Sequence, residues 1–134
     1  MAFDWREFLD LARWLQSQVE AKVGIASEAA FRSAIGRAYF AAFGHAHHYA
    51  RTWLGFQGKT KIEDKAQEHG ALRAFLKSKR RAKVAEKLSQ LRLWRNRCDY
   101  EEDLQDFDLP SQLDAALEAA DYVFQSLLPP KEKC

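Results

Sequence analysis

The segment that most constrains the fold is residues 31–43, which is apolar on nearly every side when projected on a helix. A helix without a polar face has to be covered by neighbours on several sides, so we expect it to be the central one. Two glycines, Gly36 and Gly44, are poor helix formers and indicate close approach of a neighbouring helix. Two charges, Arg32 and Arg37, interrupt the apolar surface and have to pair or reach solvent.

The remaining segments also show helical spacing. Asp4 is a candidate N-cap for a first helix that ends near Lys22 or Val23, with Gly24 after it. Ser27 caps a second helix expected over 28–53, and residues 55–61 form a loop in which Thr60 and Glu63 have capping-box spacing. Further helices are expected over 65–77, 81–100 and from Asp108 or Leu109, with Pro110 in the first turn.

Length and composition are those of a single helical domain. The 134 residues include only three prolines, and two of these, Pro129 and Pro130, stop the last helix before a frayed tail at 129–134. We expect one all-α domain over 1–134, an antiparallel bundle of four long helices plus one shorter helix. We also expect a cytoplasmic protein without a signal peptide, a membrane span or a disulfide framework.

Three local patterns resemble functional sites. His45 and His48 lie one turn apart, but no cysteine or carboxylate stands at ligand spacing beside them, so no metal site is expected. His69 is interpreted as a packing or capping residue rather than a lone general base, and the role of His47 is left open. The Gly-Lys-Thr at 58–60 ends like a phosphate-binding loop, but its spacing is too short.

Two basic features are candidates for phosphate binding. The run at 77–81 contributes Lys79, Arg80 and Arg81, which either contact nucleic acid or form a solvated helix start. The second feature is Arg95, which falls on the apolar stripe of Val84, Leu88, Leu91 and Cys98. A buried guanidinium requires partners, from Asp99 one turn later or from a carboxylate of the first helix (Asp4, Glu7 or Asp10). Alternatively, Arg95 engages a phosphate.

Two segments carry motifs with a recognisable order and spacing. Residues 31–43 are similar to a helix that reads R-S-A-I-S-R-A-Y-Y-A-A-F-H, and residues 91–100 resemble the pattern L-R-x-x-R-N-x-x-D-Y. Together these motifs resemble the HEPN superfamily of nucleotide-binding helical domains. The resemblance covers roughly residues 5–128 and implies a helical bundle that is usually a homodimer. Many family members are metal-independent endoribonucleases of toxin–antitoxin or phage-defence systems, and others pair with a small nucleotidyltransferase.

The resemblance also implies roles for individual residues. Arg95 matches the catalytic arginine, Asn96 the polar residue after it, and Tyr100 the position of the catalytic histidine. A phenol with a pKa of about 10 is a poor general base at neutral pH. The expected function is binding of RNA or a nucleotide by Arg95, with Arg92, Arg97 and the basic run, with or without RNA cleavage and without a cofactor. The alternative is a non-catalytic partner of a small nucleotidyltransferase, in which Asp99 pairs structurally with Arg95; Arg37 is also expected to be structural.

Overall fold

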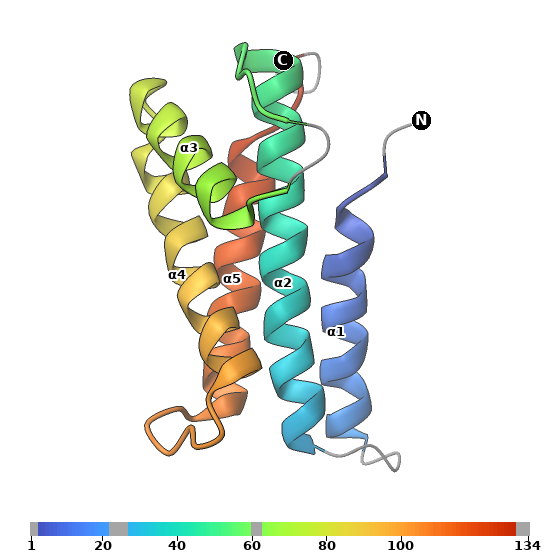
Figure 1. Ribbon diagram of the computed structural model, residues 1–134. Coiled ribbons are helices and arrows are strands. Elements are labelled where there is room, and N and C mark those ends of the chain that lie inside the picture. Colours follow the sequence, from blue (N-terminus) through green and yellow to red (C-terminus); the bar gives the residue numbers. More distant parts are fainter. Residues whose placement is uncertain (1–2, 22–26, 60–62, 131–134) are drawn as a thin grey trace.

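The computed structural model describes residues 3–21, 27–59 and 63–130, and within these ranges it contains helices and no strand. The α-helices are α1 (Arg6–Glu20), α2 (Ser27–Tyr49), α3 (Lys65–Ser78), α4 (Ala82–Tyr100) and α5 (Leu109–Ser126). In Figure 1, α1, α2, α4 and α5 run alternately down and up, and the shorter α3 lies obliquely beside the upper part of α4. The all-helical prediction is therefore confirmed for the described residues.

The apolar segment does lie in the centre, because α2 packs against α1, α4 and α5. The side chains that it buries are mostly small: Ala34, Ala38, Ala41, Ala42 and Ala46 are fully buried. Small side chains let three neighbouring helices approach one axis closely without leaving voids. The same central position brings the aromatic residues of α2 opposite the arginines of α4.

The two glycines of α2 differ in what they do. A Cβ on Gly44 would lie 1.9 Å from Cδ2 of Trp5, so this glycine provides the space in which the indole ring sits. A Cβ on Gly36 would meet only Cγ of Arg95 at 3.8 Å and Oδ1 of Asp99 at 4.0 Å, which are ordinary contacts. Close approach is thus confirmed at Gly44, whereas the same prediction was wrong for Gly36.

The end of the second helix departs from the prediction. The α-helix stops at Tyr49 and the chain continues as a π-helix over Ala50–Leu54. Gly55 ends this segment with φ of 81°, a left-handed conformation that glycine adopts without steric cost. Single π-helical turns within helices often mark functional positions, and this one carries Arg51, which donates a hydrogen bond to the buried His47.

Several predicted helix boundaries need correction. Asp4 does not occupy the N-cap of α1, which is Trp5, although its carboxylate accepts a hydrogen bond from the Arg6 N–H at 3.0 Å. Asp64 caps α3 by accepting from the Gln67 N–H at 3.0 Å. The proposed caps at Gly24 and Thr60, and the tail from 131, lie outside the described residues.

The buried faces of the last two helices follow the predicted spacing. On α4, Val84, Leu88, Leu91 and Cys98 are all buried. On α5 and its C-cap, a corresponding stripe is buried, formed by Leu113, Leu117, Ala120, Phe124 and the C-cap residue Leu127. Cys98 is a free thiol, and burial raises its pKa to about 11. No helix within the described ranges is long and apolar enough to cross a membrane.

Candidate anion-binding site

A pocket of about 220 Å³ lies between α2 and α4 and combines aromatic with cationic side chains. We call it the aromatic pocket. Tyr39, Phe40 and Phe43 share one side of α2, while Arg92 and Arg95 are neighbours one turn apart on α4. The remaining lining residues are Trp5, seated on Gly44, and Lys65, the first residue of α3. The fold thus places residues from four parts of the chain around one cavity.

The ring of Phe40 is surrounded by cations. The guanidinium carbon of Arg37 lies 4.7 Å from the ring centre, that of Arg95 lies 5.0 Å away, and the Lys65 ammonium lies 6.0 Å away. Each contact is a favourable cation–π interaction, but three like charges around one ring also repel one another. An anion placed here would offset that repulsion.

Arg95 has one carboxylate partner and unused hydrogen-bonding capacity. Its Nε lies 2.8 Å from Oδ2 of Asp99, and its Nη1 donates to Oδ1 of Asn96 at 3.2 Å. The buried Nε nevertheless makes no hydrogen bond, because its hydrogen is not directed at the nearby carboxylate oxygen. The Arg95–Asp99 contact is therefore an ion pair that leaves a buried donor unsatisfied, which native structures rarely tolerate without a ligand or water.

Arg92 is not paired at all within the described part of the chain: no hydrogen bond or ion pair joins it to another described residue.

The positive charge of Arg92 acts to lower the pKa of two buried groups, Tyr39 and His69. Burial raises the pKa of Tyr39 to about 12, although Arg92 and Arg95 oppose this change, so Tyr39 remains a phenol. Its hydroxyl lies 3.1 Å from Nδ1 of His69. Burial, then Arg92 and Arg73, lower the pKa of His69 to about 4, so this imidazole is neutral at pH 7.

The structure brings together only part of the predicted catalytic set. Arg92 and Arg95 line the aromatic pocket, and Asn96 lines a neighbouring cavity that also contains Arg92. Tyr100, at the last residue of α4, is 75 % exposed and lines neither cavity. The position matched to the family's histidine is thus separated from the two arginines.

The guanidinium of Arg97 is occupied by contacts within the protein. It forms ion pairs with Glu101 at 3.1 Å and with Asp106 at 2.6 Å, and its guanidinium lies 4.2 Å from the ring centre of Phe107. The hydrogen bond from Arg97 lowers the pKa of Asp106. These contacts tie the acidic 101–108 connector to the end of α4.

The basic run lies at the α3–α4 junction, away from both cavities. Lys79 and Arg80 are exposed, and Lys79 extends over the ring of Phe75 at 5.5 Å. The half-buried Arg81 donates to the Lys79 carbonyl at 3.0 Å. This placement favours the interpretation of a solvated helix start.

Two arginines of α2 behave differently from each other. Arg37 lies over the rings of Phe8 and Phe40 and has no carboxylate partner among the described residues, so it belongs to the cationic surroundings of the pocket. Arg32 pairs with Glu28 at 2.9 Å and donates to three carbonyl oxygens at the end of α4, those of Cys98, Glu101 and Glu102. Positive charge at a helix C-terminus is stabilising. The sequence signalled only that Arg32 needs partners.

Of the four histidines, His47 and His69 are buried, while His45 and His48 are half-buried. No group of three side chains that could hold a metal occurs in the described ranges. His45 stacks on Phe124 with ring centres 4.3 Å apart, and its Nε2 lies 2.8 Å from the Leu127 carbonyl oxygen. Burial is the main cause that lowers the pKa of His45.

His47 forms a buried pair that sequence reasoning missed. Its Nε2 lies 2.6 Å from Glu68, and Arg51 donates to its Nδ1 at 3.2 Å. Because Nδ1 accepts the hydrogen bond from Arg51, Nε2 is the ring nitrogen that carries a proton toward Glu68. Burial raises the pKa of Glu68, but hydrogen bonds from His47 and from the Lys59 N–H outweigh it and the net pKa is lowered. The partners are 21 positions apart, and no local pattern connects them.

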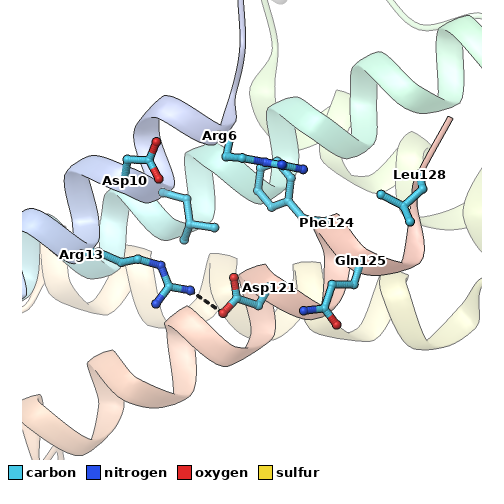
Figure 2. Close-up of a pocket in the computed structure, with 8 residues that line it drawn as sticks. Arg6, Asp10, Arg13, Asp121, Phe124, Gln125 and Leu128 are labelled. Atoms are coloured by element: carbon cyan, nitrogen blue, oxygen red, sulfur yellow. Dashed lines mark hydrogen bonds and ion pairs between the residues drawn. The ribbon is translucent and has the colours of Figure 1, made fainter. Parts of the chain in front are cut away.

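A larger hollow of about 370 Å³ lies between α1 and α5 but suits an anion less well (Figure 2). Its two arginines, Arg6 and Arg13, are balanced by Asp10 and Asp121. Figure 2 shows Arg13 joined to Asp121 and Arg6 lying against the Phe124 ring. The aromatic pocket, whose lining contains three cations and no carboxylate, is the better candidate.

No known family model, curated protein or solved structure matches this chain. The site must therefore be interpreted from its own geometry.

Proposed function

We propose that this protein is a HEPN-type module that binds a nucleotide unit in the aromatic pocket, either as a free nucleotide or within single-stranded RNA. The observation that carries the proposal is the composition of that pocket. Its lining combines three cations with four aromatic side chains and contains no carboxylate. A nucleotide presents the complementary pair of features, an anionic phosphate and a flat aromatic base.

In this proposal the arginines of α4 contact the phosphate, and the aromatic side chains of α2 and Trp5 contact the base. Arg92 and Arg95 of α4 supply guanidinium groups, which bind phosphate oxygens through two parallel hydrogen bonds. Trp5, Phe40 and Phe43 supply an apolar wall against which a base packs, and base–aromatic stacking contributes about 1–3 kcal/mol per base. The proposal requires no metal or cofactor.

We propose binding rather than cleavage. Metal-independent cleavage of RNA needs a group that takes a proton from the 2′-hydroxyl, with a pKa close to the working pH. Tyr100 is exposed outside the cavities, and His69, with a pKa of about 4, is a weak base whose Nδ1 is engaged by Tyr39. Incubation of a labelled RNA with the wild-type protein in EDTA tests this point; cleavage that depends on Arg95 would contradict it.

The proposal extends to a homodimer that contacts its partner through α4. Leu93 and Tyr100 are 58 % and 75 % exposed, and seven positions place them on one face of the helix. Exposed apolar side chains on one face favour association with a second surface.

A second candidate function is a non-catalytic interaction module that partners a small nucleotidyltransferase. The ion pair between Arg95 and Asp99 at 2.8 Å supports it, because such a pair can serve packing alone. The candidates differ in the effect of Arg95→Met, which keeps the apolar stem. An interaction module loses stability through the unpaired carboxylate but has no nucleotide affinity to lose. A binding module loses affinity.

Fluorescence anisotropy with a labelled single-stranded RNA tests the proposed function directly. We expect Arg92→Gln and Arg95→Gln each to weaken binding at least tenfold and to lower the slope of log affinity against log salt by about 1, as for loss of one phosphate contact. Arg80→Gln is the matched control, since it removes the same charge from the exposed junction. Equal weakening by all three variants would show non-specific attraction and reject the proposal.

A further inference from the structure

A second cavity lies beside the aromatic pocket, between α3 and α4, and we call it the α3–α4 pocket. Its volume is about 170 Å³, and its lining residues are His69, Arg73, Ser89, Arg92, Leu93 and Asn96. It is smaller than the aromatic pocket, whose volume is about 220 Å³, and it suits a single chemical group. Arg92 lines both cavities.

Two polar atoms of this lining lack the partners that buried groups normally have. Nε of Arg73 and Oγ of Ser89 are both buried, and neither makes a hydrogen bond within the described residues. In native proteins the large majority of such atoms are satisfied, and the exceptions require an explanation. The third unsatisfied buried side-chain atom in the described ranges, Nε of Arg95, belongs to a residue of the adjoining aromatic pocket. All three exceptions thus occur at one location.

The chemistry of the missing partner follows from these groups. A guanidinium N–H can only donate, and a serine hydroxyl can donate as well. The partner must accordingly present several acceptor oxygens in a small volume. Asn96 adds an amide to the lining, although its Oδ1 already accepts from Arg95. A phosphate group, with acceptor oxygens on every side, fits this donor set.

The charge of the pocket agrees with that assignment. No carboxylate lines the cavity, and neither Arg73 nor Arg92 has an ion-pair partner among the described residues. The third ionisable residue of the lining, His69, is a neutral imidazole, because burial and the two arginines lower its pKa to about 4. Two half-buried guanidinium groups therefore face a small cavity without a counter-ion.

We propose that the α3–α4 pocket binds one phosphate group, held by Arg73, Ser89 and Arg92. The proposal stands independently of whether a base enters the aromatic pocket. Phosphate from two sources presents the same chemistry: a free inorganic phosphate ion, or a phosphate of a nucleic-acid backbone that also reaches the aromatic pocket. Arg92 would contact the phosphate in either case.

The test is a titration of the full chain with inorganic phosphate, followed by NMR of the arginine Nε–H groups. We expect the Arg73 signal to shift and to saturate. Arg73→Gln should weaken phosphate binding at least tenfold, and Arg80→Gln, which removes an equal charge at an exposed position, should leave it unchanged. Uniform, unsaturated shifts across basic residues, or wild-type affinity in Arg73→Gln, would overturn the proposal.

Ser89→Ala keeps the test valid if the arginine variant folds poorly. This change removes an unsatisfied hydroxyl, so the variant without phosphate should melt at or above the wild-type temperature. Added phosphate should raise the melting temperature of the wild type and raise that of Ser89→Ala by less. An equal rise in both proteins would contradict the role of Ser89 and of the pocket.

Adding a single-stranded RNA oligonucleotide to the phosphate-saturated protein distinguishes the two sources. Loss of the phosphate-induced Arg73 shift, replaced by a shift from the oligonucleotide, assigns the pocket to a backbone phosphate. Persistence of the phosphate-induced shift while RNA binds assigns it to free phosphate. No Arg73-dependent binding of either ligand rejects the pocket while leaving the anisotropy test of the aromatic pocket unaffected.

Discussion

Replacing each glycine of α2 with alanine tests how the aromatic pocket is built. The two positions are matched, because both glycines are buried in the same helix. A Cβ at position 36 meets only ordinary contacts at 3.8 Å and 4.0 Å. A Cβ at position 44 would lie 1.9 Å, 2.1 Å and 2.4 Å from three atoms of the Trp5 indole. The second change therefore cannot be accommodated without moving Trp5.

The expected magnitudes follow from two effects. Alanine within a helix is favoured over glycine by roughly 1 kcal/mol, so Gly36→Ala should stabilise the protein by about that amount. Gly44→Ala gains the same propensity but expels a half-buried indole, whose packing contributes about 2 kcal/mol if half of the usual loss for a buried tryptophan applies. The net change at position 44 is a loss of about 1 kcal/mol, and the two variants should differ by about 2 kcal/mol.

Thermal unfolding measured by circular dichroism checks these values. A difference of about 2 kcal/mol corresponds to melting temperatures that differ by about 7 °C for a chain of this size. Gly44→Ala should also weaken RNA binding, because Trp5 lines the aromatic pocket, whereas Gly36→Ala should not. Equal stabilisation by both substitutions would refute the contact between Trp5 and α2.

Three further predictions concern the pH dependence of stability, the end of α4 and association. The pKa of His69 in the folded protein is about 4, below its ordinary value of 6.5. Between these two pH values the unfolded chain therefore binds more protons than the folded one. The free energy of unfolding should fall as the pH decreases from 6.5 to 4, by about 3 kcal/mol in total. Urea unfolding at several pH values should show a weaker dependence for His69→Gln, and an unchanged dependence would contradict this; His45 keeps a contribution of the same sign. Arg32→Met removes the hydrogen bonds to three carbonyl oxygens at the end of α4 and should cost about 2 kcal/mol, whereas unchanged urea unfolding would show that these bonds contribute little. If the proposed homodimer forms through α4, the wild type should sediment as a dimer and Leu93→Asp as a monomer in sedimentation velocity experiments; a Leu93→Asp variant that remains dimeric would exclude this face of α4.

The fold was largely predictable because its strongest signals are local. The apolar segment of α2, the stripe containing Val84 and Leu88, and the position of Pro110 in the first turn of α5 each depend on residues within one helix. Boundaries set by hydrogen bonds between nearby residues were less predictable. The π-helical end of α2 depends on how Gly55 terminates the helix, which periodicity does not reveal.

The site was predictable only where its contacts are local. The ion pair between Arg95 and Asp99 joins residues one turn apart, so the helical projection finds it. The contact of Tyr39 with His69 spans 30 positions, and the seat of Trp5 on Gly44 spans two helical segments. Such pairs depend on how the helices pack, and no spacing rule within one helix identifies them.

Photo-crosslinking tests most directly the central claim that a nucleotide unit binds beside Arg92 and Arg95. A single-stranded RNA carrying 4-thiouridine would be bound, irradiated and mapped on the protein by mass spectrometry. The described surface offers more accessible tryptophans elsewhere, since Trp14 is 54 % and Trp53 is 45 % exposed. We predict crosslinks at Trp5, Tyr39 or Phe40 that disappear in Arg95→Gln. Crosslinks confined to Trp14 or Trp53 would contradict the account.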